Sequence, residues 1–156
     1  MRIYEILNEL NIEYDEVQHA PLYTVEEAQK AALQIVGVGC KNLFLTDKKG
    51  NYFLLILEES KRANMKEIKN ILGVSSLIFA SDEELREILS LERGSVTPLG
   101  IINDINHKVK IIVDHDLMNK RILAHPNTNT RTLSIHYDDL IRFIEYEGHE
   151  YILYDC

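Results

Sequence analysis

The chain has 156 residues and a formal net charge of −8, and 46% of its residues are hydrophobic. These values are typical of one soluble globular domain, so we expect residues 1–156 to form a single domain. The acidic balance argues against broad, non-specific binding of nucleic acid, while a local basic patch stays compatible with it. Two distant cysteines, the lack of a membrane-length apolar run and an acidic, amphipathic start favour a cytoplasmic protein without membrane contact.

The spacing of apolar residues, together with turn and capping residues, predicts both helices and strands. In chain order these are a helix over 1–10, a strand over 13–19, a helix over 24–33, a hairpin over 40–57, a helix over 64–72, a short strand over 76–80, a helix from 81 to 89 or 91, a second hairpin formed by 100–104 and 109–113, a helical turn at 114–116, strands over 121–125 and 131–135, a helix over 137–146 and a strand over 151–154. Because some strands pair locally and others need crossovers, the pattern predicts an α/β domain with a central mixed, largely antiparallel sheet flanked by helices.

The hairpin over 40–57 is the strongest of these patterns. Its two apolar runs flank a polar Asp-Lys-Lys-Gly-Asn turn, and neither run alternates between apolar and polar residues. Both faces of the hairpin should therefore be covered, which places it at the centre of the sheet. Lys41 and Asn42 enter its first strand directly after a glycine-containing loop, and a lysine there either reaches solvent or meets an anionic partner.

Enzyme signatures of the common kinds are missing from the sequence, which has no P-loop, no Gly-x-Gly-x-x-Gly, no Gly-x-Ser-x-Gly and no Cys-x-x-Cys. The six histidines lack the spacing of a zinc site. Asp114, His115 and Asp116 could bind a metal, but the start of a helical turn explains them better. Cys40 beside Lys41 has no evident base partner, and we interpret it as a small buried residue rather than a nucleophile.

Two further loops carry groups that could bind a substrate. The loop over 94–100, Gly-Ser-Val-Thr-Pro-Leu-Gly, presents consecutive backbone N–H groups that can hold a carbonyl or carboxyl oxygen, although a helix end followed by a turn is the simpler explanation. His125, Pro126 and Asn129 lie in a polar loop just after a strand, where a plain turn is again simpler. Seven of the 17 basic residues lie between positions 41 and 69, and this cluster is either a solvated surface or a nucleic-acid patch.

Three motifs, in this order and spacing, resemble the YbaK/ProX family of prolyl-tRNA editing proteins. They are the run Lys-Asn-Leu-Phe-Leu at 41–45, the loop Gly94-Ser95-Val96-Thr97-Pro98 with Gly100 and Asn103-Asp104 behind it, and His125-Pro126 with Asn129 and Thr132. The resemblance covers most of the chain, from about residue 19 to 153, and is closest to the free-standing alanyl-tRNA(Pro) deacylase branch.

This resemblance implies a hydrolase, without metal or cofactor, that cleaves the ester of alanine wrongly attached to tRNA(Pro). A synthetase pocket shaped for proline cannot strongly reject a smaller amino acid, because a missing methylene is worth only about 1–3 kcal/mol, so a second site must remove the product. Lys41 would be the catalytic residue, anchoring the phosphate of the terminal adenosine or the substrate carbonyl. The aminoacyl group would be bound by the other motif residues: Asn42, Gly94, Ser95, Val96, Thr97, Pro98, Gly100, His125 and Asn129.

The resemblance also implies that a ribose hydroxyl of the tRNA helps to activate water. The partners would be the acceptor end of tRNA(Pro), steered by the basic cluster, and prolyl-tRNA synthetase.

Leu99, Asn127, Thr128 and Arg131 depart from the family pattern around this pocket. These departures concern the amino acid that is recognised more than the reaction, so cysteinyl-tRNA(Pro) editing stays an alternative. A non-catalytic module that binds tRNA or a synthetase is a second alternative, which tight tRNA binding without turnover would indicate. A metal-dependent hydrolase is a third, which loss of activity with a chelator would indicate.

Overall fold

The computed structural model describes residues 2–22, 24–32 and 34–155. The elements of this part of the chain are α1 (Arg2–Glu9), β1 (Tyr14–Gln18), α2 (Val25–Ala32), β2 (Cys40–Thr46), β3 (Tyr52–Glu58), α3 (Met65–Leu72), β4 (Ile78–Phe79), α4 (Asp82–Leu89), the 3-10 helix η1 (Pro98–Asn103), β5 (Val109–Asp114), the 3-10 turn η2 (His115–Leu117), β6 (Arg121–Ala124), β7 (Arg131–His136), α5 (Tyr137–Tyr146) and β8 (Tyr151–Tyr154). None of these helices has both the length and the apolar character needed to cross a membrane.

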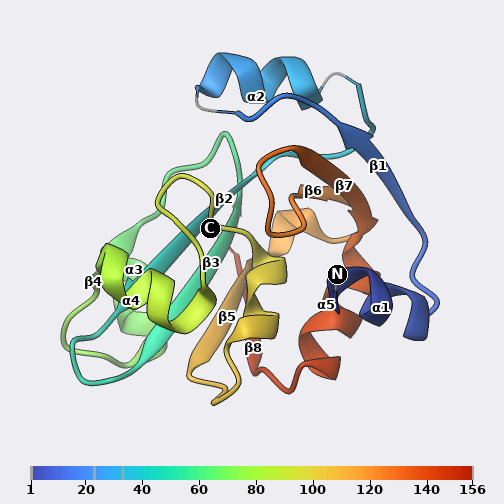
Figure 1. The fold of residues 1–156 in the computed structure, drawn as a ribbon. Coiled ribbons are helices and arrows are strands. Elements are labelled where there is room, and N and C mark those ends of the chain that lie inside the picture. Colours follow the sequence, from blue (N-terminus) through green and yellow to red (C-terminus); the bar gives the residue numbers. More distant parts are fainter. Residues whose placement is uncertain (1, 23, 33, 156) are drawn as a thin grey trace.

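The strands form two sheets (Figure 1). The larger sheet is mixed, with the strand order β4-β2-β3-β5-β8: β2 runs antiparallel to β3 and β4, whereas β5 runs parallel to β3 and β8. The smaller sheet is antiparallel, with the order β1-β7-β6. The predicted α/β fold with a mixed sheet is confirmed, and β3 of the predicted hairpin is the central strand. The sequence did not predict that β1, β6 and β7 form a sheet of their own.

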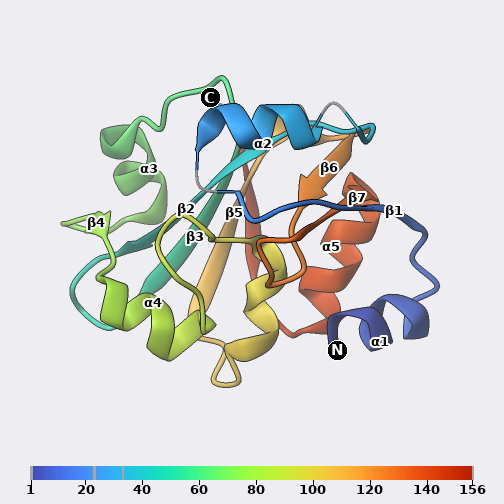
Figure 2. The ribbon, with the colours of Figure 1, turned by 45° about the horizontal axis from the view of Figure 1, so that its top comes forward.

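Both faces of the larger sheet are buried, as the lack of alternation in the hairpin predicted. Phe44 and Ile56 face the main core, which the sheet shares with α1, α4, η1, α5 and the smaller sheet. Leu45 and Leu57 face the other side, which α3 covers with Ile68. Figure 2 shows α3 and α5 on opposite sides of the larger sheet. Successive residues of β2 therefore point into different layers of the molecule.

The second predicted hairpin, formed by 100–104 and 109–113, is wrong. Pro98–Asn103 forms η1 instead, and Val109–Asp114 forms β5, which pairs with β3 and β8. Pro98 favours the helix because its fixed φ and missing N–H suit the first turn, and Thr97 caps that turn. An apolar pair such as 101–102 fits a strand or a buried helical turn equally well, so the local pattern could not decide between them.

Asp104 joins the end of η1 to β5 and to the turn before β8. Its buried carboxylate accepts hydrogen bonds from the backbone N–H groups of Lys108 and Val109 and lies 3.0 Å from Nε2 of His149. Burial alone would raise the pKa of Asp104, but the hydrogen bonds from His149 and the two N–H groups outweigh it and hold the pKa below its usual value. Three segments of the core thus depend on one charged group.

We predict that Asp104→Asn lowers the free energy of unfolding by about 3 kcal/mol at pH 7, because an amide cannot replace the charge or accept all three hydrogen bonds. Since the pKa of Asp104 is depressed in the folded state, its stabilisation is present above about pH 4 and is lost as the pH falls further. Urea unfolding at a series of pH values should show the two proteins converging in acid. The exposed Asp155→Asn serves as the control, and equal stability of the two variants at pH 7 would contradict the prediction.

Candidate active site

The first two site residues predicted from the sequence, Lys41 and Asn42, point to opposite faces of β2. The Asn42 side chain lies on the main-core face, where its Nδ2 donates a hydrogen bond to the Val96 carbonyl at 3.2 Å. Lys41 lies on the face that α3 covers, and its Nζ donates to the Lys61 carbonyl at 2.6 Å. The structure therefore brings Asn42 to the predicted loop over 94–100 and places Lys41 on the other side of the strand.

The loop over 94–100 is held in place from three sides. The Thr97 hydroxyl, which is fully buried, donates to the His125 carbonyl at 2.8 Å, and Asn42 binds the loop at Val96. A Cβ on Gly100 would lie 2.6 Å from Cδ1 of Leu91, so a larger residue here would force the Leu91 side chain to move. These contacts fix the loop against β2 and against the segment that follows β6.

Part of the predicted N–H donor set is already used within the loop. The Ser95 N–H donates to the Glu92 carbonyl, and the Gly100 N–H donates to the Thr97 carbonyl. The N–H groups of Val96 and Thr97 make no hydrogen bond within the described part of the chain. These two neighbouring donors could hold a substrate oxygen, and the rest of the loop is support.

His125 lies against this loop with an imidazole whose two nitrogens are buried and have no hydrogen-bond partner of normal geometry among the described residues. Burial lowers the pKa of His125; the Ser95 backbone opposes this shift and the charge of His19 adds to it. The ring is therefore uncharged at neutral pH. A neutral imidazole can donate from one nitrogen and accept at the other, so His125 is equipped to bind a polar group or a water molecule.

Asn127 is a further candidate site residue, which stands out in the sequence only as a departure from the family pattern. Its backbone has φ = 59°, and its Oδ1 lies 3.6 Å from the position that a Cβ on Gly100 would take. This Oδ1 is buried without a partner among the described residues, as is Oδ1 of Asn42. Asparagine in a polar stretch predicts a tight turn because it tolerates positive φ, but nothing in the local sequence shows that its amide turns toward a distant loop.

Asn42, His125 and Asn127 thus carry unpartnered buried polar atoms, and all three lie against the segment 95–100. Leaving a buried polar group unpaired costs about 1–3 kcal/mol, and native proteins retain few such groups. Their concentration around one loop indicates a site for a small polar ligand that supplies the missing donors and acceptors.

Asn129, the last predicted binding residue, has a different environment. Its Nδ2 donates to the Leu22 carbonyl at 2.7 Å, and Nε2 of His19 lies 2.8 Å from the Thr132 hydroxyl nearby. These contacts tie the loop between β6 and β7 to the segment that leads to α2. The structure therefore places Asn129 where it orients the chain around the site.

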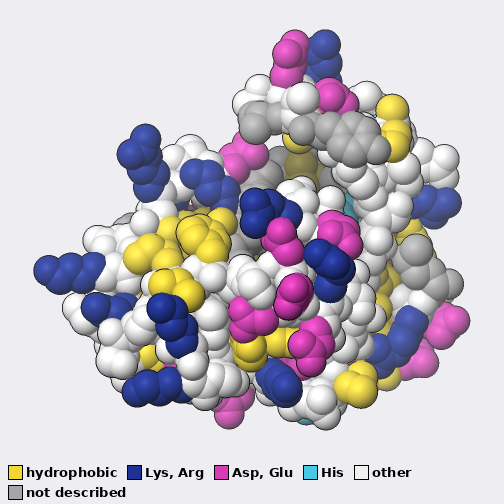
Figure 3. Space-filling model, turned by 60° about the vertical axis from the view of Figure 1, so that its left-hand side comes forward, with side chains coloured by type: hydrophobic (Ala, Val, Ile, Leu, Met, Phe, Trp, Pro, Cys, Tyr) yellow, Lys and Arg dark blue, Asp and Glu magenta, His cyan; other side chains and the backbone are white. Residues whose placement is uncertain are grey.

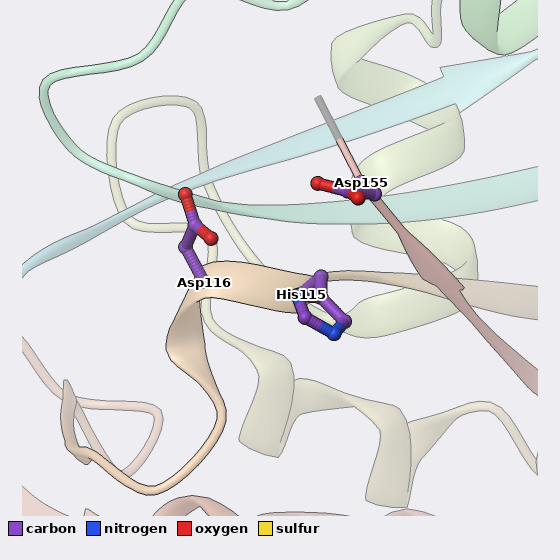
Figure 4. Close-up of side chains that lie close together, drawn as sticks. All are labelled: His115, Asp116 and Asp155. Atoms are coloured by element: carbon purple, nitrogen blue, oxygen red, sulfur yellow. The ribbon is translucent and has the colours of Figure 1, made fainter.

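Two residues of the run considered as a metal ligand set from sequence, His115 and Asp116, belong to a cluster that follows the C-terminal end of β5. Ligand atoms of His115, Asp116 and Asp155 lie within 4.8 Å of one another, and Figure 4 shows the three side chains at the exposed ends of η2 and β8. The Asp116 carboxylate is already 2.6 Å from the Lys61 ammonium. Because exposed acidic groups of this kind are common without an ion, the cluster does not identify a metal site.

Cys40 precedes Lys41 and has no role as a nucleophile in this geometry. Burial, reinforced by the nearby carboxylates of Glu59, Asp114 and Glu58, raises the pKa of the Cys40 thiol to about 12. Its Sγ lies 3.8 Å from the Val38 carbonyl. A thiol with this pKa stays protonated at neutral pH, in agreement with the interpretation from sequence.

A model of the aminoacyl-tRNA editing domain matches residues 19–143, and the chain belongs to this family. The chain is 34% identical over 147 residues to the prolyl-tRNA editing protein ProX of Acetoanaerobium sticklandii. The aligned region covers 93% of this chain and 90% of that protein. It is 36% identical over 148 residues to prolyl-tRNA synthetase associated domain-containing protein 1 of Danio rerio, covering 93% and 80% of the two chains.

Among solved structures, one described as a candidate trans-editing enzyme for prolyl tRNA synthetase superposes with a TM-score of 0.72 over 97% of this chain and 93% of that one. At 20% identity this similarity shows the fold. The family resemblance drawn from the three sequence motifs is confirmed by these matches.

We predict that Cys40 reacts with a thiol reagent such as DTNB at pH 8 at least 100-fold more slowly in the native protein than after unfolding, because so little thiolate is present. The measurement uses the Cys156→Ser variant, so that only Cys40 contributes. Equal rates in the native and unfolded states would show that Cys40 is exposed and ionised, contrary to this geometry.

Proposed function

We propose that this chain is a trans-editing deacylase that hydrolyses the ester between a wrongly attached amino acid and tRNA(Pro). The observation that carries the proposal is the set of unpartnered polar atoms of Asn42, His125 and Asn127 around the loop over 94–100. Membership of the aminoacyl-tRNA editing family and the names of the two relatives support a prolyl-tRNA substrate. Residues 1–156 would act as one editing domain, with prolyl-tRNA synthetase as a further partner.

The proposed amino acid is alanine, which a synthetase pocket built for proline cannot strongly exclude. Its α-ammonium group has three N–H donors, and the unpartnered Oδ1 atoms of Asn42 and Asn127 are acceptors of the kind that it needs. Leu91 packs against Gly100 behind the loop, which keeps this wall of the site rigid and apolar. Cysteine, which is also small, is the alternative that the experiment below separates.

The hydrolysis proposed here needs only polar groups of the chain and of the tRNA. The oxygen of a water molecule attacks the ester carbonyl carbon, the bond from that carbon to the ribose oxygen breaks, and the proton from water passes to the ribose oxygen. The N–H groups of Val96 and Thr97 would hold the carbonyl oxygen as negative charge develops. The neutral His125 would position the water, assisted by the adjacent ribose hydroxyl. We therefore propose that no metal takes part.

Lys41 would bind the phosphate of the terminal nucleotide rather than the reacting carbonyl. Its ammonium lies on the face of β2 opposite Asn42, and one of its three donors is occupied by the Lys61 carbonyl. The remaining donors suit a phosphate oxygen at the edge of the sheet. In this arrangement the RNA passes the end of β2 on the α3 side, and the aminoacyl group turns over the strand into the site.

We predict that the wild type removes alanine from alanyl-tRNA(Pro) while sparing prolyl-tRNA(Pro), and that Lys41→Ala lowers kcat/KM by at least about tenfold through the lost phosphate contact. The exposed Lys120→Ala is the charge-matched control, and EDTA should leave the rate unchanged. Deacylation of alanyl-, cysteinyl- and prolyl-tRNA(Pro) is followed by loss of labelled amino acid. Preference for the cysteinyl ester would replace alanine by cysteine in the proposal, and hydrolysis of none of the three would reject it.

We predict that His125→Ala reduces the rate about 100-fold yet leaves the free energy of unfolding within about 1 kcal/mol, because the lost packing is offset by removing two buried ring nitrogens that lack a hydrogen bond of normal geometry. His136→Ala is the reciprocal control: its Nδ1 accepts from the Asp138 N–H at the start of α5, so this change should cost about 1 kcal/mol of stability and no activity. Single-turnover kinetics and thermal unfolding measure the two effects. A fully active His125→Ala protein would show that the imidazole is not part of the site.

A further inference from the structure

The basic residues that cluster in the sequence separate in the fold. Positions 48–49 lie in the turn between β2 and β3, about 23 Å from Lys41 along an extended strand. Lys61 lies beside Lys41, and its own ammonium is held in ion pairs with two carboxylates. The other three members of the cluster lie just before α3 or on it: Arg62, Lys66 and Lys69.

These three cations have no counter-charge in the described part of the chain. No carboxylate there lies within 4.0 Å of them, whereas ion pairs neutralise basic residues on other helices, such as Arg142 of α5. Positions 62–76 hold three basic residues and one acidic residue, in a chain whose net charge is −8. The segment is therefore locally cationic on an acidic body.

The surface beside α3 is also hollowed. Lys66 and Lys69 line an open cavity of about 450 Å³ together with Ser75 and Ser76, with Met65 and Leu77 completing it. Figure 3 shows basic side chains prominent at one side of the view, while acidic side chains gather toward its centre. Lysine ammonium and serine hydroxyl groups are the donors that proteins direct at the phosphates of nucleic acids.

The cationic surface lies on the same face of the larger sheet as Lys41. Ile68 of α3 packs on Leu45 and Leu57, and Leu57 is the direct cross-strand neighbour of Lys41. Lys61, whose carbonyl Lys41 binds, is five residues before Lys66, which limits their separation to about 17 Å of chain. A backbone bound at Lys41 can therefore continue across α3.

We propose that Arg62, Lys66 and Lys69, with the hydroxyls of Ser75 and Ser76, form a binding surface for the backbone phosphates of the tRNA acceptor stem. The inference rests on the proposed function for the identity of the RNA. It gives the acidic chain a path for nucleic acid that does not include the two lysines of the sequence cluster at positions 48–49. Contacts of this kind set affinity and orientation without reading sequence.

A protein partner is the competing occupant of this side of the molecule. Ile71 and Phe79 expose half or more of their surface on α3 and β4, and such apolar side chains suit a protein interface. The cavity itself, however, is lined mainly by lysines and serines and by none of the exposed apolar residues. Unpaired cations next to hydroxyls match phosphate better than an apolar surface.

The test measures binding of uncharged tRNA(Pro) by fluorescence anisotropy over a range of salt concentrations, so it does not depend on hydrolysis. Lys66→Ala/Lys69→Ala is compared with Lys48→Ala/Lys49→Ala, which removes the same charge from the far turn. We expect the first pair to weaken binding roughly tenfold and to reduce the salt slope by about 1–2, and the second pair to change affinity less than about twofold. Alanyl ester on a short CCA oligonucleotide without the stem should be hydrolysed equally by all three proteins.

Equal losses from the two pairs would show general charge steering and overturn the proposal, as would unchanged binding in Lys66→Ala/Lys69→Ala. Unchanged tRNA binding combined with loss of a complex with purified prolyl-tRNA synthetase would assign the surface to a protein partner. Normal, lysine-dependent tRNA binding without hydrolysis of any ester would retain this surface and reject the deacylase.

Discussion

The double burial of the β2–β3 hairpin is the constraint on which the site depends. A strand covered on both faces sends neighbouring residues into different layers, so Asn42 reaches the loop over 94–100 while Lys41 reaches the α3 side. In the proposed function, these two adjacent residues would bind two parts of one ligand, Asn42 its reactive end and Lys41 its phosphate. A slip of one residue in the pairing of β2 with β3 would send Lys41 toward the main core and Asn42 toward the α3 side.

Leaving the polar atoms of the candidate site without hydrogen-bond partners destabilises the folded protein, and the contacts around the site offset this loss of free energy. The loop is fixed by Thr97 on the His125 carbonyl and by the close packing of Leu91 on Gly100. The far end of η1 is fixed by Asp104, which holds β5 and the turn before β8 together. In the proposed function, this support would keep the side chains of Asn42, His125 and Asn127 from turning toward one another and leave their polar atoms to the ligand.

Much of the fold follows from patterns that can be read locally. The hairpin, the helices over 64–72 and 137–146 and the cap at Ser81 each have a strong periodic or capping signal, and the structure contains all of them. The hairpin predicted over 100–113 was wrong because a short apolar run does not distinguish a strand from a buried turn. In the separate sheet, β1 pairs with β7, which lies more than 100 residues further along the chain. No local sequence pattern predicts a pairing over that distance.

The candidate site, like the fold, could be predicted from the sequence only in part. Asn42, His125 and the loop were indicated by sequence motifs, and the structure brings them together. Asn129 came from the same motif but binds the Leu22 carbonyl, and Asn127, two positions earlier, turns its amide to the loop instead. Which asparagine of a polar turn faces inward depends on backbone dihedral angles and distant packing rather than on composition. The opposite orientation of Lys41 and Asn42, by contrast, could have been derived from the strand period alone.

The central claim is that the unpartnered atoms of Asn42, His125 and Asn127 bind the aminoacyl group. The most direct test is a crystal structure with 3′-deoxy-3′-(alanylamino)adenosine, whose amide replaces the ester and resists hydrolysis. The account predicts the alanyl group between these three side chains and the loop over 94–100, with the Oδ1 atoms of Asn42 and Asn127 within 3.2 Å of the α-ammonium nitrogen, a normal hydrogen-bond distance. A ligand bound elsewhere, or these atoms hydrogen-bonded only to water while the alanyl group lies outside the loop, would contradict it.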